Sequence, residues 1–207
     1  MGLHRSVNMR LLTSLVICLA ILILAVAFVI SLGLLDQFDY ELTRGINTFA
    51  DQSSIPAAIL FTEFGGELVW IALGALLYLL GGSYGRRSVV ILAASILLGV
   101  IIDLLTNQIF YRPRPYMVLS DLNFFISNPP SDSSFPSGHT VRAFAGATVL
   151  SYRYKRWSPI MLTFAVAVGF SRIYLGLHFP SDVLGGALIG LTVSLVVIMV
   201  EGKFLNR

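Results

Sequence analysis

Long apolar segments alternate with short polar ones along the whole chain. The first, at residues 11–35, is nearly unbroken and follows two arginines. It is longer than the roughly 7–15 apolar residues of a signal-peptide core, so it predicts an uncleaved membrane helix. Five later segments are each roughly long enough to cross a hydrocarbon core of about 30 Å. The six expected spans are residues 11–35, 66–82, 88–106, 137–152, 158–175 and 182–201.

A different pattern follows the first segment, with acidic side chains among regularly spaced apolar ones. The segment is residues 36–54. Apolar residues recur at helical spacing from its start, at Leu35, Phe38 and Leu42, which is typical of an amphipathic helix in the membrane interface. An ordinary loop fits the same residues equally well. A second short interfacial helix is expected at 55–62. The whole pattern predicts an all-α bundle of six transmembrane helices with a short interfacial helical segment, forming one domain over residues 1–207.

The composition agrees with an integral membrane protein. Of the 207 residues, 56% are hydrophobic and 12% are charged, whereas a soluble domain carries about 25% charged residues. The net charge of +3 comes from dispersed basic residues, which argues against a nucleic-acid-binding surface. Cys18 is the single cysteine, so no disulfide can form within the chain.

Ionisable residues gather between the last two expected spans, in the segment 171–182. Arg172 lies six residues before His178, and Asp182 lies four residues after it. Charge at the edge of a membrane is costly and therefore indicates a function. A carboxylate can fix the tautomer of an imidazole and leave its other nitrogen free as a nucleophile, and a guanidinium binds two phosphate oxygens. The segment thus predicts a phosphate-handling histidine.

Two further polar clusters precede the fourth expected span. Residues 136–139 read Pro-Ser-Gly-His and open that span, where a hydroxyl and a free backbone N–H at a helix N-terminus form a natural anion site. Arg112 and Arg114 lie just beyond the third span. They belong to the long polar loop 107–136, whose length favours a functional role.

The three clusters resemble the three signature motifs of the type-2 phosphatidic acid phosphatase superfamily, which comprises membrane lipid phosphatases and soluble haloperoxidases. Arg172, His178 and Asp182 match the third motif at full spacing, and residues 136–139 match the second. Arg114 and the proline after it match the end of the first. The resemblance covers residues 107–182 and implies hydrolysis of a lipid phosphate without a metal or any other cofactor.

The resemblance also implies a role for each matched residue. His178 is the expected nucleophile, which forms a phosphohistidine, and Asp182 is expected to orient its ring. His139 protonates the leaving alkoxide and later activates water. The expected ligands of the phosphoryl oxygens are Ser137, Gly138, Arg114 and Arg172.

One position departs from the family pattern. The family carries a lysine seven residues before the arginine of its first motif, and this chain has Asn107 there. Asparagine keeps a donor but loses the charge, and Asp103, one helical turn earlier, makes the local field more negative. We therefore expect a weak phosphate contact at Asn107 and a slow enzyme, unless Arg112 or Arg142 supplies the missing charge.

Three other ionisable residues leave more than one role open. Asp103 and Arg142 lie within apolar segments and should face the bundle interior. A structural ion pair between them is the preferred interpretation, although Arg142 would also be placed to compensate for the absent lysine. Arg112 would contact a diphosphate or a lipid headgroup, or lie solvated at the interface. His4 is expected to be an ordinary residue of the N-terminal tail.

The distribution of charge predicts the orientation of the bundle. Basic residues cluster at 5–10, 86–87, 153–156 and 203–207, all on one side of the six expected spans. The positive-inside rule then places both termini in the cytoplasm and all three motifs at the extracytoplasmic face of the plasma membrane.

The leading hypothesis is a multi-pass membrane phosphatase acting on phosphatidylglycerol phosphate or undecaprenyl pyrophosphate. The expected partners are the lipid substrate and the bilayer, with no nucleic acid and no obligate protein partner. A lipid-binding or lipid-translocating protein would use the same cationic pocket without chemistry, but binding alone does not need two histidines. The haloperoxidase branch is soluble, which disfavours that activity.

Overall fold

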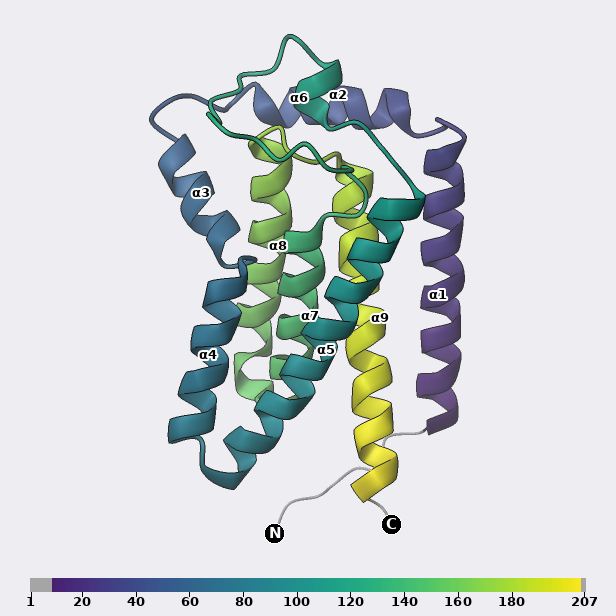
Figure 1. Ribbon diagram of the computed structural model, residues 1–207, viewed down its shortest axis with the longest axis vertical. Helices are drawn as coiled ribbons and strands as arrows, with labels where there is room; N and C mark the ends of the chain where they lie inside the picture. The colour runs from purple at the N-terminus through teal and green to yellow at the C-terminus, as the bar shows by residue number, and fades with distance from the viewer. Residues whose placement is uncertain (1–8, 206–207) are drawn as a thin grey trace.

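The computed structural model describes residues 9–205, and this part of the chain folds into helices and loops without strands. The longer helices run roughly along the long axis of the molecule, and α2, α6 and the loops around them close one end (Figure 1). His4 lies outside the described residues. The elements are α1 (Met9–Ser31), α2 (Asp36–Asn47), α3 (Ile55–Glu63), α4 (Glu67–Leu80), α5 (Gly82–Ile109), α6 (Pro115–Val118), α7 (Gly138–Arg153), the 3-10 helix η1 (Lys155–Trp157), α8 (Ser158–Tyr174) and α9 (Pro180–Leu205).

Helix α7 lies inside the bundle, packed against α5, α8 and α9. Small residues permit this close packing, because they let helix backbones approach one another. A Cβ atom at Gly190 of α9 would lie 2.5 Å from the carbonyl oxygen of Val141. A Cβ atom at Gly146 would overlap the indole ring of Trp70 in α4. The motif at the start of α7 is therefore held by helices on several sides.

The helices expected from the apolar segments are all present, but they differ in their capacity to cross a membrane. Helices α1, α5 and α9 are long and apolar enough to do so. Helices α3 and α4 together form a fourth candidate, bent by 48° at the break between them. Helices α7 and α8 have 16 and 17 residues, which corresponds to about 24–26 Å at a rise of 1.5 Å per residue. The described residues thus contain at least three candidate spans.

Helix α2 is amphipathic, as its spacing predicts, and its polar stripe faces the protein. Phe38 and Leu42 are exposed on the opposite side. Asn47 accepts a hydrogen bond from the backbone N–H of Asn123 and donates to its carbonyl, which fixes α2 to the loop after α5. A loop over residues 36–47 is therefore excluded. The buried residues of α2 are Asp39, Thr43 and Asn47.

The two ends of the bundle differ in what they carry. The turns between α4 and α5 and between α7 and α8 lie at the same end as the start of α1 and the end of α9 (Figure 1). Arg86, Arg87 and Lys155 belong to these turns or to the helix ends beside them. The loop 110–137, the start of α7 and the turn between α8 and α9 lie at the other end, beneath α2.

Candidate active site

His178 lies in the tight turn between α8 and α9. Gly176 has a φ of 67°, a conformation that favours glycine. The backbone N–H groups of Leu177 and His178 donate to the carbonyl of Arg172, at 3.0 and 3.2 Å, which folds the turn back onto the end of α8. The imidazole is only 2% exposed, so its nitrogens must find partners within the protein.

Both ring nitrogens of His178 have a partner. Nδ1 lies 2.7 Å from the carbonyl oxygen of Ser134, and Nε2 lies 3.0 Å from Nη1 of Arg114. A carbonyl only accepts, so the ring proton is on Nδ1 and Nε2 carries a lone pair. Burial lowers the pKa of His178 well below its usual value, and the charges of Arg114 and Arg172 lower it further. The ring is therefore neutral, as a nucleophile must be.

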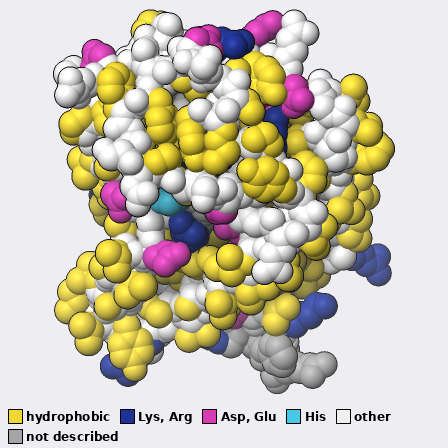
Figure 2. Space-filling model, turned by 45° about the horizontal axis from the view of Figure 1, so that its top comes forward, with side chains coloured by type: hydrophobic (Ala, Val, Ile, Leu, Met, Phe, Trp, Pro, Cys, Tyr) yellow, Lys and Arg dark blue, Asp and Glu magenta, His cyan; other side chains and the backbone are white. Residues whose placement is uncertain are grey.

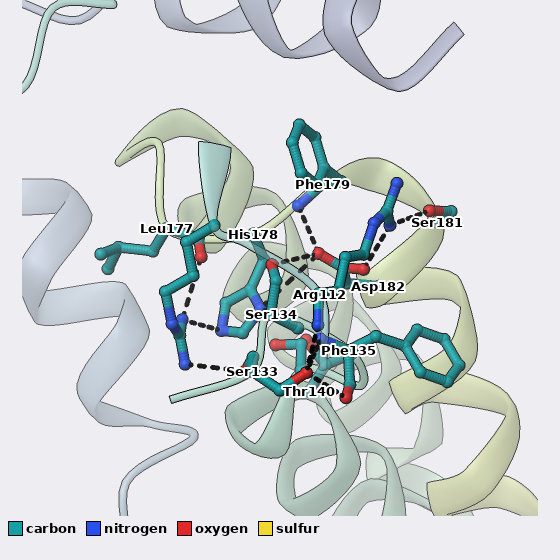
Figure 3. A network of polar contacts seen from close by, with 12 residues as sticks. Arg112, Ser133, Ser134, Phe135, Thr140, Leu177, His178, Phe179, Ser181 and Asp182 are labelled. Atoms are coloured by element: carbon teal, nitrogen blue, oxygen red, sulfur yellow. Dashed lines mark hydrogen bonds and ion pairs between the residues drawn. The ribbon is translucent and has the colours of Figure 1, made fainter. Parts of the chain in front are cut away.

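Asp182 lies near His178 without bonding to it, which corrects the expected direct hydrogen bond. Its Oδ2 atom is 3.9 Å from Nδ1. The carboxylate instead accepts hydrogen bonds from the Ser134 hydroxyl, the Phe179 backbone N–H and Arg112 (Figure 3). Asp182 thus contacts the ring only indirectly, through Ser134, whose hydroxyl it binds and whose carbonyl binds the ring. Sequence reasoning missed Ser134 because it contributes a backbone carbonyl, which any residue type provides.

Arg112 is buried in an ion-pair network, so its expected role as a solvated residue at the interface is wrong. Its Nη1 lies 2.6 Å from Oδ1 of Asp182, and its Nη2 lies 2.7 Å from Oδ2 of Asp39. The guanidinium also lies over the ring of Phe179, 4.4 Å from the centroid. Burial lowers the pKa of Arg112, but the carboxylates of Asp182 and Asp39 outweigh this effect and raise it. The guanidinium of Arg112, which was expected to contact a phosphate, a headgroup or solvent, is therefore paired with two buried carboxylates.

Arg114 lies next to His178. Besides its contact with Nε2 of His178, its Nη1 donates to the carbonyl of Leu177 at 3.0 Å. Its Nη2 pairs with Oδ1 of Asp132 at 2.8 Å. The side chain of Asp132 is 59% exposed, whereas that of Arg114 is buried. Arg114 thus joins the buried histidine to the surface of the site.

Arg172, at the end of α8, is buried with one donor unused. Its Nη1 donates to the hydroxyl of Thr62 in α3 at 2.9 Å, while its Nε has no hydrogen-bond partner. An unsatisfied buried donor is costly. Arg172 therefore has a donor free for a bound anion.

The second motif forms the start of α7. Ser137 is buried, and its hydroxyl accepts a hydrogen bond from the hydroxyl of Thr140 at 2.9 Å. A Cβ atom at Gly138 would overlap the carboxylate of Asp103, so glycine is needed there. His139 is half-buried, and its Nδ1 lies 3.3 Å from Nη2 of Arg142. Histidine, basic and acidic side chains lie next to one another on the face shown in Figure 2.

The position of the absent lysine is occupied by an amide beside a carboxylate. The side-chain nitrogen of Asn107 donates to Oδ1 of Asp103 at 3.3 Å, and its oxygen is buried without a partner. Arg142 turns toward the break between α3 and α4, where its Nε donates to the carbonyl of Gly65 at 2.8 Å and its Nη1 lies 3.8 Å from Oε1 of Glu67. No ion pair within 4.0 Å joins Asp103 to Arg142 in the described part of the chain, so the expected pair is wrong.

The donor set favours an anion rather than a metal ion. Within residues 9–205, no three His, Cys, Asp or Glu side chains are grouped so that they could hold a metal. Arg142 instead lies 3.3 Å from Nδ1 of His139, and Arg114 lies 3.0 Å from Nε2 of His178. The site can therefore stabilise a phosphate or another compact anion beside two histidines.

An apolar cavity of about 460 Å³ lies beside the site, between α4 and α5. Its walls include Trp70, Ile71 and Leu97, and Arg142 and Glu67 lie among its lining residues. The cavity thus joins an apolar surface to the polar residues near His139.

Comparisons with known proteins find a matching family model and several similar proteins. The family model described as PAP2 superfamily matches residues 88–205. The chain is 28% identical over 165 residues to an undecaprenyl-diphosphatase of Sulfolobus acidocaldarius, covering 79% of each chain. It is 29% identical over 158 residues to undecaprenyl-diphosphatase BcrC of Bacillus subtilis, covering 75% of this chain and 80% of that protein. The crystal structure of Aquifex aeolicus LpxE matches with a TM-score of 0.70 and 33% identity, over 78% of this chain and 94% of that chain.

Proposed function

Because the chain belongs to the PAP2 superfamily, we propose that it is a membrane phosphatase that hydrolyses lipid phosphates or diphosphates through a phosphohistidine. The observation that carries this proposal is the state of His178. Its ring is buried and neutral, its Nδ1 is held by the Ser134 carbonyl, and its Nε2 lies 3.0 Å from Arg114. A buried imidazole oriented from one side is prepared to attack from the other.

In the proposed reaction, Nε2 of His178 attacks the terminal phosphorus atom, and its bond to the bridging oxygen breaks. The lipid alcohol (from a monoester) or the lipid phosphate (from a diphosphate) leaves with a proton from His139. Arg114 exchanges its contact with Nε2 for a phosphoryl oxygen, because its Nη1 occupies the lone pair that must attack. The free Nε of Arg172, with Ser137 and the N-terminus of α7, stabilises the charge of the transition state. Water activated by His139 then releases phosphate from His178. These residues supply the nucleophile, the acid and the anion site, so we propose that no metal takes part.

Undecaprenyl diphosphate is the first substrate to test, because two relatives aligned over most of this chain are named for its hydrolysis. The apolar cavity between α4 and α5 suits a hydrocarbon chain. Phosphatidylglycerol phosphate is the second substrate, since both lipids present a terminal phosphate at the bilayer surface. We place the single-domain enzyme in the plasma membrane, with six spans, cytoplasmic termini and an extracytoplasmic site.

The competing function is a protein that binds or translocates lipid phosphates without chemistry. Such a protein would need the arginines but not a neutral, oriented imidazole. The two histidines also have separate environments, since the ring of His178 is held by a backbone carbonyl and that of His139 lies beside Arg142. A protein that only binds lipid phosphates would not need two imidazoles held in different ways.

The test is phosphate release by the purified protein in detergent micelles from undecaprenyl diphosphate, phosphatidylglycerol phosphate and phosphatidic acid. The wild type should release phosphate in the presence of a chelator, and His178→Ala should release none while keeping its thermal unfolding transition. His139→Ala should accumulate phosphate bound to the protein. Binding of all three lipids without release would favour the translocating protein, and near wild-type turnover in His178→Ala would exclude this nucleophile.

A further inference from the structure

Asp39 is a fully buried carboxylate that belongs to none of the three motifs. It lies on α2 and is 0% exposed. Its neighbours Asp36 and Glu41 on the same helix are much more exposed. A buried carboxylate must be paired and hydrogen-bonded to be tolerated, so the partners of Asp39 indicate what it does.

These partners come from the first and third motif regions. Oδ2 of Asp39 accepts a hydrogen bond from Nη2 of Arg112 at 2.7 Å and another from the hydroxyl of Ser181. Oδ1 accepts from the backbone N–H of Ser181 at 3.0 Å. Asp39 therefore binds one edge of the Arg112 guanidinium and the first turn of α9 together.

The other edge of the same guanidinium leads to the nucleophile. Nη1 of Arg112 donates to Oδ1 of Asp182, Oδ2 of Asp182 accepts from the hydroxyl of Ser134, and the carbonyl of Ser134 holds Nδ1 of His178 (Figure 3). The chain of contacts from Asp39 to the ring is continuous and buried throughout. A displacement of Arg112 would therefore reach the carbonyl that orients the imidazole.

The charges of this network also act on the ring. Two buried carboxylates share one guanidinium, so Asp39, Asp182 and Arg112 together carry a net charge of −1 (two negative charges and one positive). Phosphorylation of Nε2 makes the imidazole positive, and a nearby negative charge stabilises that state. Without the carboxylate of Asp39, only Asp182 and the more distant, more exposed Asp36 would pair with Arg112, and the buried negative charge beside the ring would be reduced.

We propose that Asp39 is a positioning residue for the reaction at His178, which it serves by dividing the Arg112 guanidinium between itself and Asp182. The proposal rests on the proposed function only in taking Nε2 of His178 as the reacting atom. It assigns a role in the reaction to helix α2, which lies outside all three motifs.

The first experiment compares Asp39→Asn with Asp36→Asn. Asp36 is a matched control because it lies on the same helix and contacts the same Nη2 of Arg112, at 3.5 Å, with a side chain that is 44% exposed. Loss of a residue that is hydrogen-bonded to a metal-binding histidine typically lowers metal affinity or activity about 10–100-fold. We expect a loss of about tenfold in turnover here, because Asp39 is more distant from the ring. The turnover of Asp39→Asn on a lipid phosphate should thus fall about tenfold with little change in KM, while Asp36→Asn stays within about twofold of the wild type.

The second readout does not require hydrolysis. Orthovanadate adopts the five-coordinate geometry of a phosphoryl transition state, and such analogues bind more tightly than substrates. Calorimetric titration should show that vanadate binding is lost in His178→Ala, weakened about tenfold in Asp39→Asn and unchanged in Asp36→Asn. A wild type that binds vanadate but hydrolyses no lipid would refute the proposed function. The vanadate affinities of the variants would then still test the role of Asp39. A wild type that binds no vanadate would refute both proposals.

A third variant covers the case in which Asp39→Asn does not fold. Ser181→Ala removes one hydroxyl between Arg112 and Asp39 and keeps every charge. Turnover and vanadate affinity should both fall about threefold, as expected for one hydrogen bond. If folded Asp39→Asn or Ser181→Ala protein has a lower unfolding temperature but wild-type turnover and vanadate affinity, Asp39 has a structural role only and the proposal is wrong.

Discussion

Asn107 leaves the proposed phosphate site without the positive charge that a lysine would bring. Replacing it by lysine should raise turnover on a lipid phosphate about tenfold, the equivalent of about 1.4 kcal/mol, because a charged hydrogen bond contributes about 1.5–3 kcal/mol. The neighbouring carboxylate of Asp103, which now accepts from the Asn107 amide, gives the new ammonium a partner and should make it tolerable. Steady-state phosphate release by purified Asn107→Lys measures the effect.

Asn107→Met is the control for that change, since it adds length without charge and should show no gain. Unchanged or lower turnover in well-folded Asn107→Lys protein would mean that the site does not lack this charge. Arg142, whose Nη2 lies 3.3 Å from Nδ1 of His139, would then be the compensating group.

His178 should make the protein sensitive to acid. Burial lowers its pKa below the value of about 6.5 in the unfolded chain, so protonation favours unfolding. Its contribution to stability is therefore complete above about pH 6.5 and is lost as the pH falls toward the folded-state pKa. Thermal unfolding between about pH 7.5 and pH 5 should show a smaller loss in His178→Gln than in the wild type. Parallel curves for the two proteins would contradict a buried, neutral ring.

The residues of the third motif were predictable because they lie close together in the sequence. Arg172 and His178 are separated by one turn of backbone, and their spacing alone indicated a shared site. Asp39 and the Ser134 carbonyl were not predictable, because their partners lie far away in the sequence. The ion pair from Asp39 to Arg112 spans 73 residues, and an acidic residue on an amphipathic helix is ordinarily solvated.

At the scale of elements, hydropathy predicted every long helix but misplaced some boundaries. Helix α5 begins at Gly82, before the expected start at residue 88. Arg86 and Arg87 predicted that the apolar span starts after them. The helix nevertheless includes both residues, because backbone hydrogen bonding does not depend on whether the side chains are apolar. Charged side chains therefore do not mark where this helix begins.

Packing between α4 and α7 should depend on Gly146. A Cβ atom there would overlap the ring of Trp70, and overpacking of this kind typically costs about 1–3 kcal/mol. Gly146→Ala should lower the free energy of unfolding in detergent by that amount, and adding Trp70→Leu should restore part of it. Gly45→Ala is the matched control, because Gly45 lies in α2 with nothing within 4 Å of a new Cβ atom. It should be neutral or stabilising, and an equal loss in both variants would contradict the packing argument.

At the scale of the whole molecule, the two ends of the bundle should lie on opposite sides of the membrane. Ser131, in the loop over the site, and Ser83, in the first turn of α5, are both exposed. In a Cys18→Ser background, a membrane-impermeant thiol reagent added to intact cells should label Ser131→Cys and not Ser83→Cys, because the basic residues near Ser83 favour the cytoplasm. Both should be labelled after the cells are opened. The reverse pattern in intact cells would overturn the orientation.

The buried network around Arg112 joins segments that leave the ribosome at very different times. Asp39 emerges early, Arg112 near the middle and Asp182 with the last helix. Until α9 has been made, the guanidinium can pair with Asp39 and Asp36 of α2 but lacks its partner Asp182. The order of synthesis thus means that the network around Arg112 can be completed only after the start of α9 has been made, and a chain that stops before Pro180 lacks Ser181 and Asp182.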